Sequence, residues 1–147
     1  MDNVTRTRRG FEAFGAGDLD TLRELIHPDV VWHVSGRGAL AGDYRGIDAT
    51  FGYFTQLFER SGGTFRAELL ECAEIAPDLV ACLVRLTGTL KHGSIDSRSM
   101  MLFSEHEGRT VELSSFAEDQ YALDEADPAQ DIILPGARSE QAAPIQA

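Results

Sequence analysis

The order of two hydrophobic periodicities along the chain is the strongest constraint on its fold. Up to about residue 60, apolar residues recur every three or four positions, which is the spacing of one face of an α-helix. From about residue 65 onward, apolar and polar residues alternate, which is typical of half-buried β-strands. Helices followed by strands with short turns predict an α+β domain with an antiparallel sheet and disfavour a doubly wound parallel sheet.

The N-terminal part predicts three helices. The first runs from about Val4 and ends at Gly15 and Gly17. The second starts after Asp18, a favourable N-cap residue, and Pro28 stops it. The third begins near position 48 and closes at 61–63. Its apolar face consists of Ile47, Phe51, Phe54 and Phe58.

A short strand, VVWHV at 30–34, and a glycine-rich loop at 35–46 are expected before the third helix. The later strands are expected near 65–69, 79–90, 95–104 and 110–119. A long antiparallel sheet twists and curls. Three helices with bulky aromatic side chains cannot fill its concave face evenly. The sequence therefore predicts a mainly apolar pocket between the helices and a curved sheet.

Composition limits the choice of partners. The chain has 147 residues, which suits a single domain, and its net charge is −11. Such an acidic protein repels phosphate backbones and anionic membranes, so neither nucleic acid nor a membrane is an expected partner. No apolar run reaches the ~20 residues of a membrane helix, and the N-terminus lacks a signal peptide's apolar stretch. A cytoplasmic location is expected.

The end of the chain differs from the rest in composition. Residues 127–147 are rich in Ala, Pro, Gln and acidic residues, and their apolar cluster is 132–134. We expect residues 1–126 to form the domain and residues 127–147 to form a mostly flexible tail.

Cysteines and glycines give no sign of a metal or cofactor. Cys72 and Cys82 lie on either side of a turn signal at 76–78 and could face one another across a hairpin as buried, reduced thiols. There is no Cys-x-x-Cys motif, Cys/His cluster or glycine-rich phosphate loop. We therefore predict neither a metal nor a cofactor.

Three stretches resemble the NTF2-like superfamily and, within it, the SnoaL-like group that includes polyketide cyclases and ketosteroid isomerase-like domains. They are GAGDLDTLRELIHPDVVWHVSG at 15–36, LAGDYRGIDAT at 40–50 and EGRTVELSSFAEDQYALDEA at 107–126. The resemblance spans about residues 1–126. It implies a cone-shaped domain, often dimerised through the outer face of the sheet, so a homodimer is expected. The fold hosts isomerases, hydrolases, cyclases, dehydratases and non-enzymatic binders.

Departures from the resemblance argue against two mechanisms. Ketosteroid isomerases of this superfamily use two aspartates, and the matching positions here are Val34 and Met100. Limonene-type epoxide hydrolases use an Arg-x-Asp pair and a further Asp. The matching residues here are Arg85, Thr87 and Ser115, so both carboxylates are missing.

Asp119 is the first candidate for acid–base chemistry. In the strand expected at 110–119 it shares alternation with Val111 and Leu113, which predicts that it points inward together with Tyr121. An apolar surrounding would raise the pKa of its carboxyl group, as a general acid or base requires. The resemblance implies an acid–base Asp on a late strand, matched by Asp119 or its neighbour Glu118. Alternatively, Asp119 is exposed at the strand end or caps the turn at Tyr121.

His33 and Tyr44 complete the candidate catalytic set. A histidine can shuttle a proton near neutral pH, although alternation puts His33 on the face opposite to Trp32 and Val34. Tyr44 lies at the expected pocket mouth and could polarise a carbonyl oxygen, or it could pack over the start of the third helix. The expected substrate-binding residues are Trp32, Phe14, Phe54, Phe58, Met100 and Tyr121.

These residues favour a cofactor-independent enzyme acting on an apolar, carbonyl-bearing molecule, for example a polyketide-like one. Proton abstraction next to the carbonyl would lead to isomerisation, cyclisation or elimination, as in an isomerase, cyclase or lyase. The alternative is a non-catalytic domain that binds a small ligand or serves as a dimeric accessory. An enzyme would need Asp119 for turnover, whereas a binder would keep its affinity without it.

Overall fold

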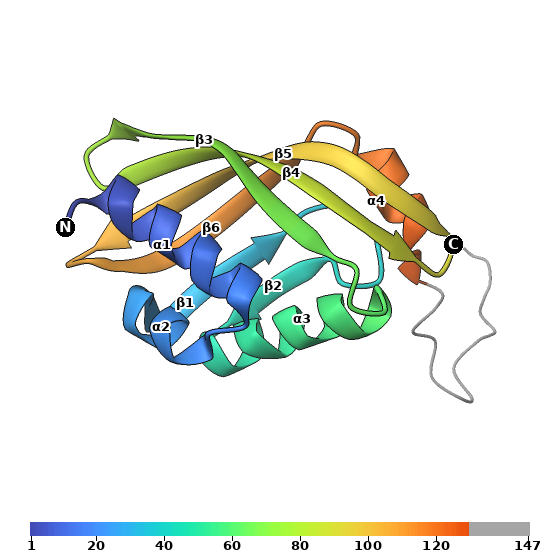
Figure 1. Ribbon diagram of the computed structural model, residues 1–147, viewed down its shortest axis with the longest axis horizontal. Helices are drawn as coiled ribbons and strands as arrows, with labels where there is room; N and C mark the ends of the chain where they lie inside the picture. The colour runs from blue at the N-terminus through green and yellow to red at the C-terminus, as the bar shows by residue number, and fades with distance from the viewer. Residues whose placement is uncertain (130–147) are drawn as a thin grey trace.

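The computed structural model describes residues 1–129, and in it helices cover one face of a six-stranded sheet (Figure 1). In chain order the elements are α1 (Asn3–Ala16), α2 (Leu19–Leu25), β1 (Ile26–Val34), β2 (Gly42–Arg45), α3 (Ile47–Arg60), β3 (Arg66–Ala76), β4 (Leu79–Leu90), β5 (Gly93–His106), β6 (Arg109–Ala117) and α4 (Gln120–Ala126). The predicted α+β class is confirmed, as are the three N-terminal helices. Helix α4 and strand β2 are additional elements.

Local sequence explains the helix boundaries. Asp2 caps α1 through a hydrogen bond from the Thr5 backbone N–H, and Gly17 ends the helix in the left-handed conformation at φ 68°. As predicted, Asp18 caps α2 and accepts a hydrogen bond from the backbone N–H of Thr21 at 3.1 Å. Helix α2 ends before Pro28, and the chain passes directly into β1.

The sheet has the strand order β2-β1-β6-β5-β4-β3. All neighbouring strands pair antiparallel except β1 and β6, which are parallel. The expectation of a wholly antiparallel sheet is therefore corrected at this one pair. No hairpin joins β1 to β6, because α3 and four strands lie between them in the sequence, so connectivity does not impose an antiparallel arrangement.

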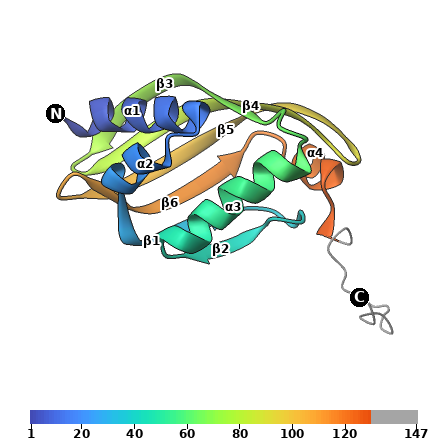
Figure 2. The same cartoon turned by 60° about the horizontal axis from the view of Figure 1, so that its bottom comes forward.

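Two apolar clusters form the core on the concave side of the sheet, where α1, α2 and α3 lie (Figure 2). One cluster lies among α1 and the strands β3 to β6, and its fully buried members include Val80, Val84 and Leu113. The other joins α2 and α3 to β1. Phe14 and Trp32 pack against both clusters, so they mark the place where the two meet.

The two cysteines are cross-strand neighbours, as predicted. Cys72 on β3 is paired in register with Cys82 on β4, and their Sγ atoms lie 3.4 Å apart. Both thiols are free and buried, and burial raises the pKa of the Cys82 thiol.

The beginning of the expected tail contacts the domain. Asp127 is buried and forms an ion pair with Arg60 of α3, and Pro128 forms an isolated β-bridge with Gly38. Residues 130–147, which include the apolar cluster at 132–134, lie outside the described residues. Within residues 1–129, no helix has the length and apolar character needed to cross a membrane.

Candidate functional site

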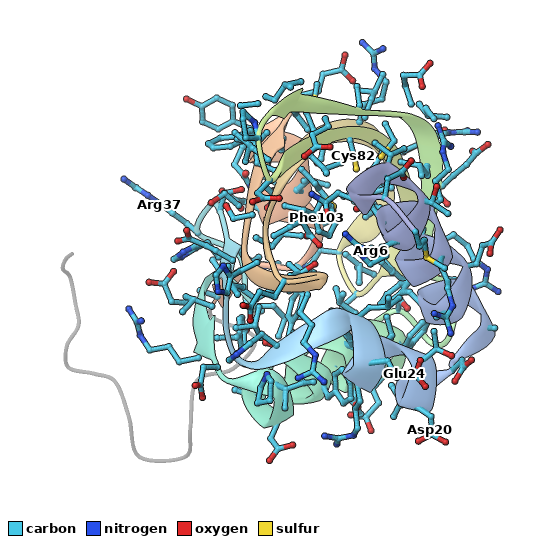
Figure 3. All side chains as sticks on the ribbon, turned by 90° about the vertical axis from the view of Figure 1, so that its left-hand side faces the viewer. Arg6, Asp20, Glu24, Arg37, Cys82 and Phe103 are labelled. Atoms are coloured by element: carbon cyan, nitrogen blue, oxygen red, sulfur yellow. The ribbon has the colours of Figure 1, made fainter. Side chains whose placement is uncertain are left out.

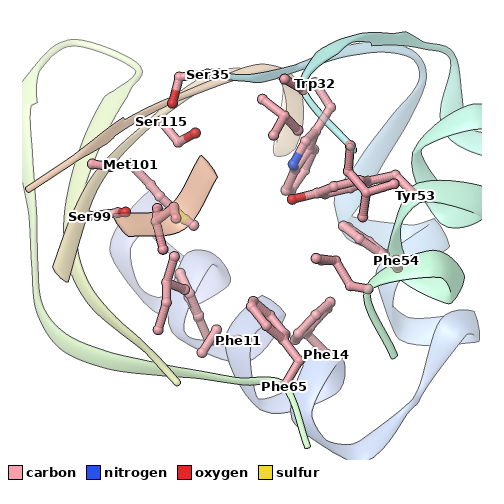
Figure 4. A pocket seen from close by; sticks show the side chains of 18 of the residues that line it. Phe11, Phe14, Trp32, Ser35, Tyr53, Phe54, Phe65, Ser99, Met101 and Ser115 are labelled. Atoms are coloured by element: carbon pink, nitrogen blue, oxygen red, sulfur yellow. The ribbon is translucent and has the colours of Figure 1, made fainter. Parts of the chain in front are cut away.

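A cavity of about 200 Å³ lies between the concave face of the sheet and helices α1 and α3 (Figure 4). Most of its wall is apolar. Aromatic side chains from both helices, from two strands and from the segment before β3 line it, namely Phe11, Phe14, Trp32, Tyr53, Phe54, Phe65 and Phe103. The cavity can therefore bury the body of an apolar molecule.

The aromatic rings support one another edge to face. The centroid of Phe54 lies 5.0 Å from that of Phe14 and 5.2 Å from that of Trp32, with interplanar angles of 82° and 84°. Phe103 makes similar contacts with Trp32 and with Phe11. Such edge-to-face packing stabilises the rings and holds the shape of the wall.

Polar groups occur at a few places on this wall. In Figure 4 the indole nitrogen of Trp32 and the hydroxyl of Tyr53 lie near one another on one side, and the hydroxyls of Ser99 and Ser115 lie on the other. Neither the indole N–H nor the Tyr53 hydroxyl hydrogen-bonds to another group in residues 1–129. Burial raises the pKa of the Tyr53 phenol, which therefore stays a hydrogen-bond donor at neutral pH.

A buried carboxyl group lines the cavity near the turn between β5 and β6. Glu105 is 6% exposed, and its Oε2 accepts a hydrogen bond from the Thr110 hydroxyl at 2.7 Å. Desolvation raises the pKa of the Glu105 carboxyl, while the bond from Thr110 and the charge of Arg6 lower it in part. The sequence analysis missed Glu105 because it placed 105–109 in a turn, whereas β5 continues to His106. Its inward direction follows from alternation with Phe103.

Helix α4 closes the wall at the opposite end of the cone (Figure 1). The Arg60 guanidinium donates two hydrogen bonds to Asp127, at 2.7 Å and 2.6 Å. The Ser35 hydroxyl donates to Oε1 of Gln120 at 2.8 Å, and the Arg37 backbone N–H donates to Asp124 at 3.0 Å. The bonds from Ser35 and Arg37 join α4 to the segment that follows β1, and those from Arg60 join α3 to the residue after α4.

The arrangement of the domain matches known proteins. Residues 7–118 match the family model described as SnoaL-like domain. The chain belongs to the SnoaL-like family. An uncharacterized protein of Mycobacterium tuberculosis, Rv0034, is 32% identical to it over 117 residues, which is 80% of this chain and 89% of that protein.

Solved structures agree with this family. The structure of Bal32a from a soil-derived mobile gene cassette has a TM-score of 0.81 and 34% identity, and it covers 84% of this SnoaL-like chain and 95% of its own. IdmH from Streptomyces antibioticus, named a candidate polyketide cyclase, has a TM-score of 0.64 and 22% identity over 82% of this chain and 95% of its own. At that identity, IdmH supports the fold alone.

The SnoaL-like cavity contains three of the expected substrate-binding residues, Trp32, Phe14 and Phe54. Phe58 does not line it. Its ring stacks on that of Phe14 at 5.5 Å between centroids, so it supports the wall from behind.

The inward position expected for Asp119 is corrected by the structure. Strand β6 ends before Asp119, which instead caps α4 by accepting a hydrogen bond from the backbone N–H of Ala122 at 3.1 Å. Asp119 is exposed and does not line the cavity. Its neighbour Glu118 pairs with Arg98, and Tyr121 on α4 is 83% exposed. Strand alternation fails for Asp119 and Tyr121 because the strand itself has ended.

His33 lies on the outer face of the sheet, opposite to Trp32, as alternation predicts. Its Nδ1 lies 2.7 Å from Oδ1 of Asp43, and its Nε2 lies 2.7 Å from Oε2 of Glu112. The hydrogen bonds to Asp43 and Glu112 raise the pKa of the imidazole. His33 therefore does not reach the SnoaL-like cavity, and its expected contact with substrate is corrected.

Tyr44 also stays outside the cavity wall. Its hydroxyl donates to the backbone carbonyl of Leu40 at 2.7 Å, and its ring lies 4.8 Å from that of Tyr53 between centroids. Tyr44 therefore supports Tyr53 and presents no free hydroxyl to a ligand.

The prediction that Met100 lines the cavity is wrong by one position. Met100 is 41% exposed on the outer face, whereas Met101 lines the cavity. Alternation along β5, with Ser99 and Phe103 buried, places Met101 inward.

Tyr53 was not predicted from the sequence because it lies beside, and not within, the apolar stripe of α3.

Within the described residues, no group of three or more His, Cys, Asp or Glu side chains is arranged to hold a metal ion.

Proposed function

We propose that this SnoaL-like protein binds one apolar, ring-containing small molecule with oxygen substituents, such as a polyketide-like compound, in the cavity. The observation that carries this proposal is the combination of an aromatic wall with two donors, on Trp32 and Tyr53, that have no hydrogen-bond partner within residues 1–129. Apolar walls with a few convergent polar groups are typical of small-molecule sites.

The two donors suit a carbonyl or hydroxyl oxygen. They come from β1 and α3, which pack against each other, and their groups lie on the same side of the cavity (Figure 4). A buried donor without a partner is costly, so a ligand oxygen that accepts from it would gain affinity. The name of the structural neighbour IdmH, a candidate polyketide cyclase, is in keeping with this ligand class.

Binding can be followed directly, because Trp32 is the single tryptophan of the chain and lines the cavity. We expect 6-hydroxy-2-tetralone to change the tryptophan fluorescence saturably. Tyr53→Phe should weaken its binding by about fivefold to tenfold, the value of one buried hydrogen bond. The hydrocarbon tetralin, which cannot accept a hydrogen bond, should bind both proteins equally.

Tyr121→Phe is the matched control, since Tyr121 is exposed on α4 and should leave both affinities unchanged. If neither compound alters the fluorescence, the ligand proposal is wrong. If both bind and Tyr53→Phe weakens neither, the assignment of Tyr53 as a donor is wrong.

We also propose that the outer face of the sheet forms a homodimer contact. Met100 and Phe116 are cross-strand neighbours there, 41% and 57% exposed. Nearby charges are already paired, Arg85 with Asp96 and Arg98 with Glu118, so a second copy would meet a largely neutral surface. Exposed apolar neighbours on a surface of this kind favour association.

Light scattering after size exclusion tests the homodimer. The wild-type protein should have the mass of two chains, and Phe116→Glu should shift it to one. Tyr121→Glu introduces the same charge on α4, away from this face, and should leave the mass unchanged. A wild-type protein that runs as a single chain would contradict the proposal.

A further inference from the structure

The contact between Glu105 and Thr110 depends on an irregularity in the sheet. On β5, Phe103 and Glu105 point toward the core. Across the ladder, Ser104 pairs with Glu112 but Glu105 pairs with Thr110, so β6 has one more residue than β5 at this point. In a regular strand, residues three positions apart point to opposite faces, yet Thr110 and Leu113 are both buried. The bulge accounts for this because it turns Thr110 inward. The bulge thus brings the Thr110 hydroxyl against the Glu105 carboxyl group inside the cavity.

Glu105 keeps one oxygen available. Thr110 donates to its Oε2, and no described residue hydrogen-bonds to its Oε1. No ion pair joins Glu105 to Arg6, the basic residue that lines the same end of the cavity. Glu105 is 6% exposed, and one of its carboxyl oxygens has no hydrogen bond from a described residue. Such a group can exchange a proton with a ligand.

Arg6 supplies the positive charge at this end of the cavity. Its terminal nitrogens bond to the Met1 carbonyl and the Asn3 carboxamide, within the start of the chain. Its Nε is buried and has no hydrogen-bond partner within residues 1–129. Seen from the N-terminal side, Arg6 and Phe103 lie inside the ring of sheet and helices (Figure 3). The guanidinium charge favours the ionised form of Glu105, which is the form that can accept a proton.

The charges around Glu105 come from several elements. Arg6 of α1 favours the carboxylate, whereas Asp78 in the turn after β3 and Glu74 of β3 disfavour it. Cys82 of β4 is also close, and burial raises the pKa of its thiol, which stays neutral. Desolvation outweighs these effects and raises the pKa of Glu105. The group is therefore better matched to acid–base work near neutral pH than an exposed glutamate.

We propose that Glu105 is a catalytic acid–base residue that removes and returns a proton at the carbon next to a ligand carbonyl. This proposal rests on the ligand binding proposed above. In the forward step the C–H bond breaks, its proton passes to Glu105, and its electron pair forms the C=C bond while the carbonyl becomes the enolate. Return of the proton to the same or a conjugated carbon regenerates the carboxylate, so no further reactant is required.

Exchange of the enolisable protons of 6-hydroxy-2-tetralone in D₂O, followed by NMR, measures this step. The wild-type protein should accelerate exchange over buffer, with a rate that rises with pH as Glu105 loses its proton. Glu105→Gln should lower the protein-dependent rate by about 10²–10⁴-fold, while the fluorescence titration shows affinity within about twofold. Glu107→Gln, an exposed residue in the adjacent turn, is the matched control and should leave the rate unchanged.

The variant Thr110→Val gives an independent readout if Glu105→Gln folds poorly. Removing the bond from Thr110, which lowers the pKa of Glu105, should move the midpoint of the pH–rate profile to higher pH. Binding without faster exchange in the wild-type protein would overturn the role of Glu105 and leave the ligand proposal intact. An unshifted midpoint in Thr110→Val would also overturn it. Absence of both binding and exchange would overturn the two proposals together.

Discussion

Replacing Phe54 by alanine is expected to lower the free energy of unfolding by about 3–5 kcal/mol, the cost of deleting a buried aromatic side chain. The Phe54 ring is buried and touches the rings of Phe14, Trp32, Phe51 and Tyr53. These contacts come from α1, β1 and α3, so its loss would open a space that no single neighbour can fill.

Chemical denaturation of Phe54→Ala and Tyr121→Ala measures this effect. Tyr121 is exposed on α4, so its truncation should change the free energy of unfolding much less. In a homodimer the comparison is made at equal protein concentration. Equal losses for both variants would show that the junction of the two apolar clusters does not carry the stability assigned to it.

The second large effect is expected at the junction of α3 with the end of α4. Arg60→Met should cost about 3–5 kcal/mol, because it leaves the Asp127 carboxylate without the two hydrogen bonds it accepts from Arg60. The side chains are only 20% and 11% exposed, so water compensates little. Thermal or chemical unfolding of the variant gives the value.

Two comparisons isolate the ion pair. Arg85→Met breaks a pair with similar geometry, Arg85 with Asp96, but on the exposed outer face, where salt bridges contribute little to stability. Adding Asp127→Leu to Arg60→Met removes the unpaired carboxylate and should restore much of the lost stability. A double variant no more stable than Arg60→Met would mean that the cost arises from packing, not from the unpaired charge.

The buried carboxyl group of the cavity lies away from the late-strand position that the resemblance favoured, and this changes where acid–base chemistry is expected. Asp119, which the SnoaL-like resemblance favoured, serves as a helix cap at the surface. The buried carboxyl group lies instead near the β5–β6 turn, at Glu105. The enzyme hypothesis for this chain therefore depends on Glu105, whereas the ligand-binding hypothesis depends on Trp32 and Tyr53.

What the sequence by itself determined was local. Gly17 and Asp18 set the boundary between α1 and α2 through backbone conformation and capping. Alternation put Trp32 inside and His33 outside, and the turn signal at 76–78 indicated that Cys72 could face Cys82. These features depend on residues a few positions apart, so a pattern of apolar and polar residues is enough to predict them.

The tertiary structure decided the rest. Where β6 ends determines that Asp119 faces water, and the bulge beside Glu105 determines that Thr110 faces the cavity. Arg60 and Asp127 meet although they are 67 residues apart. Each outcome depends on which segments of the chain pack together. Contacts between distant segments leave no periodic signal in the sequence, and for that reason the active groups proposed here had to be located in the folded chain.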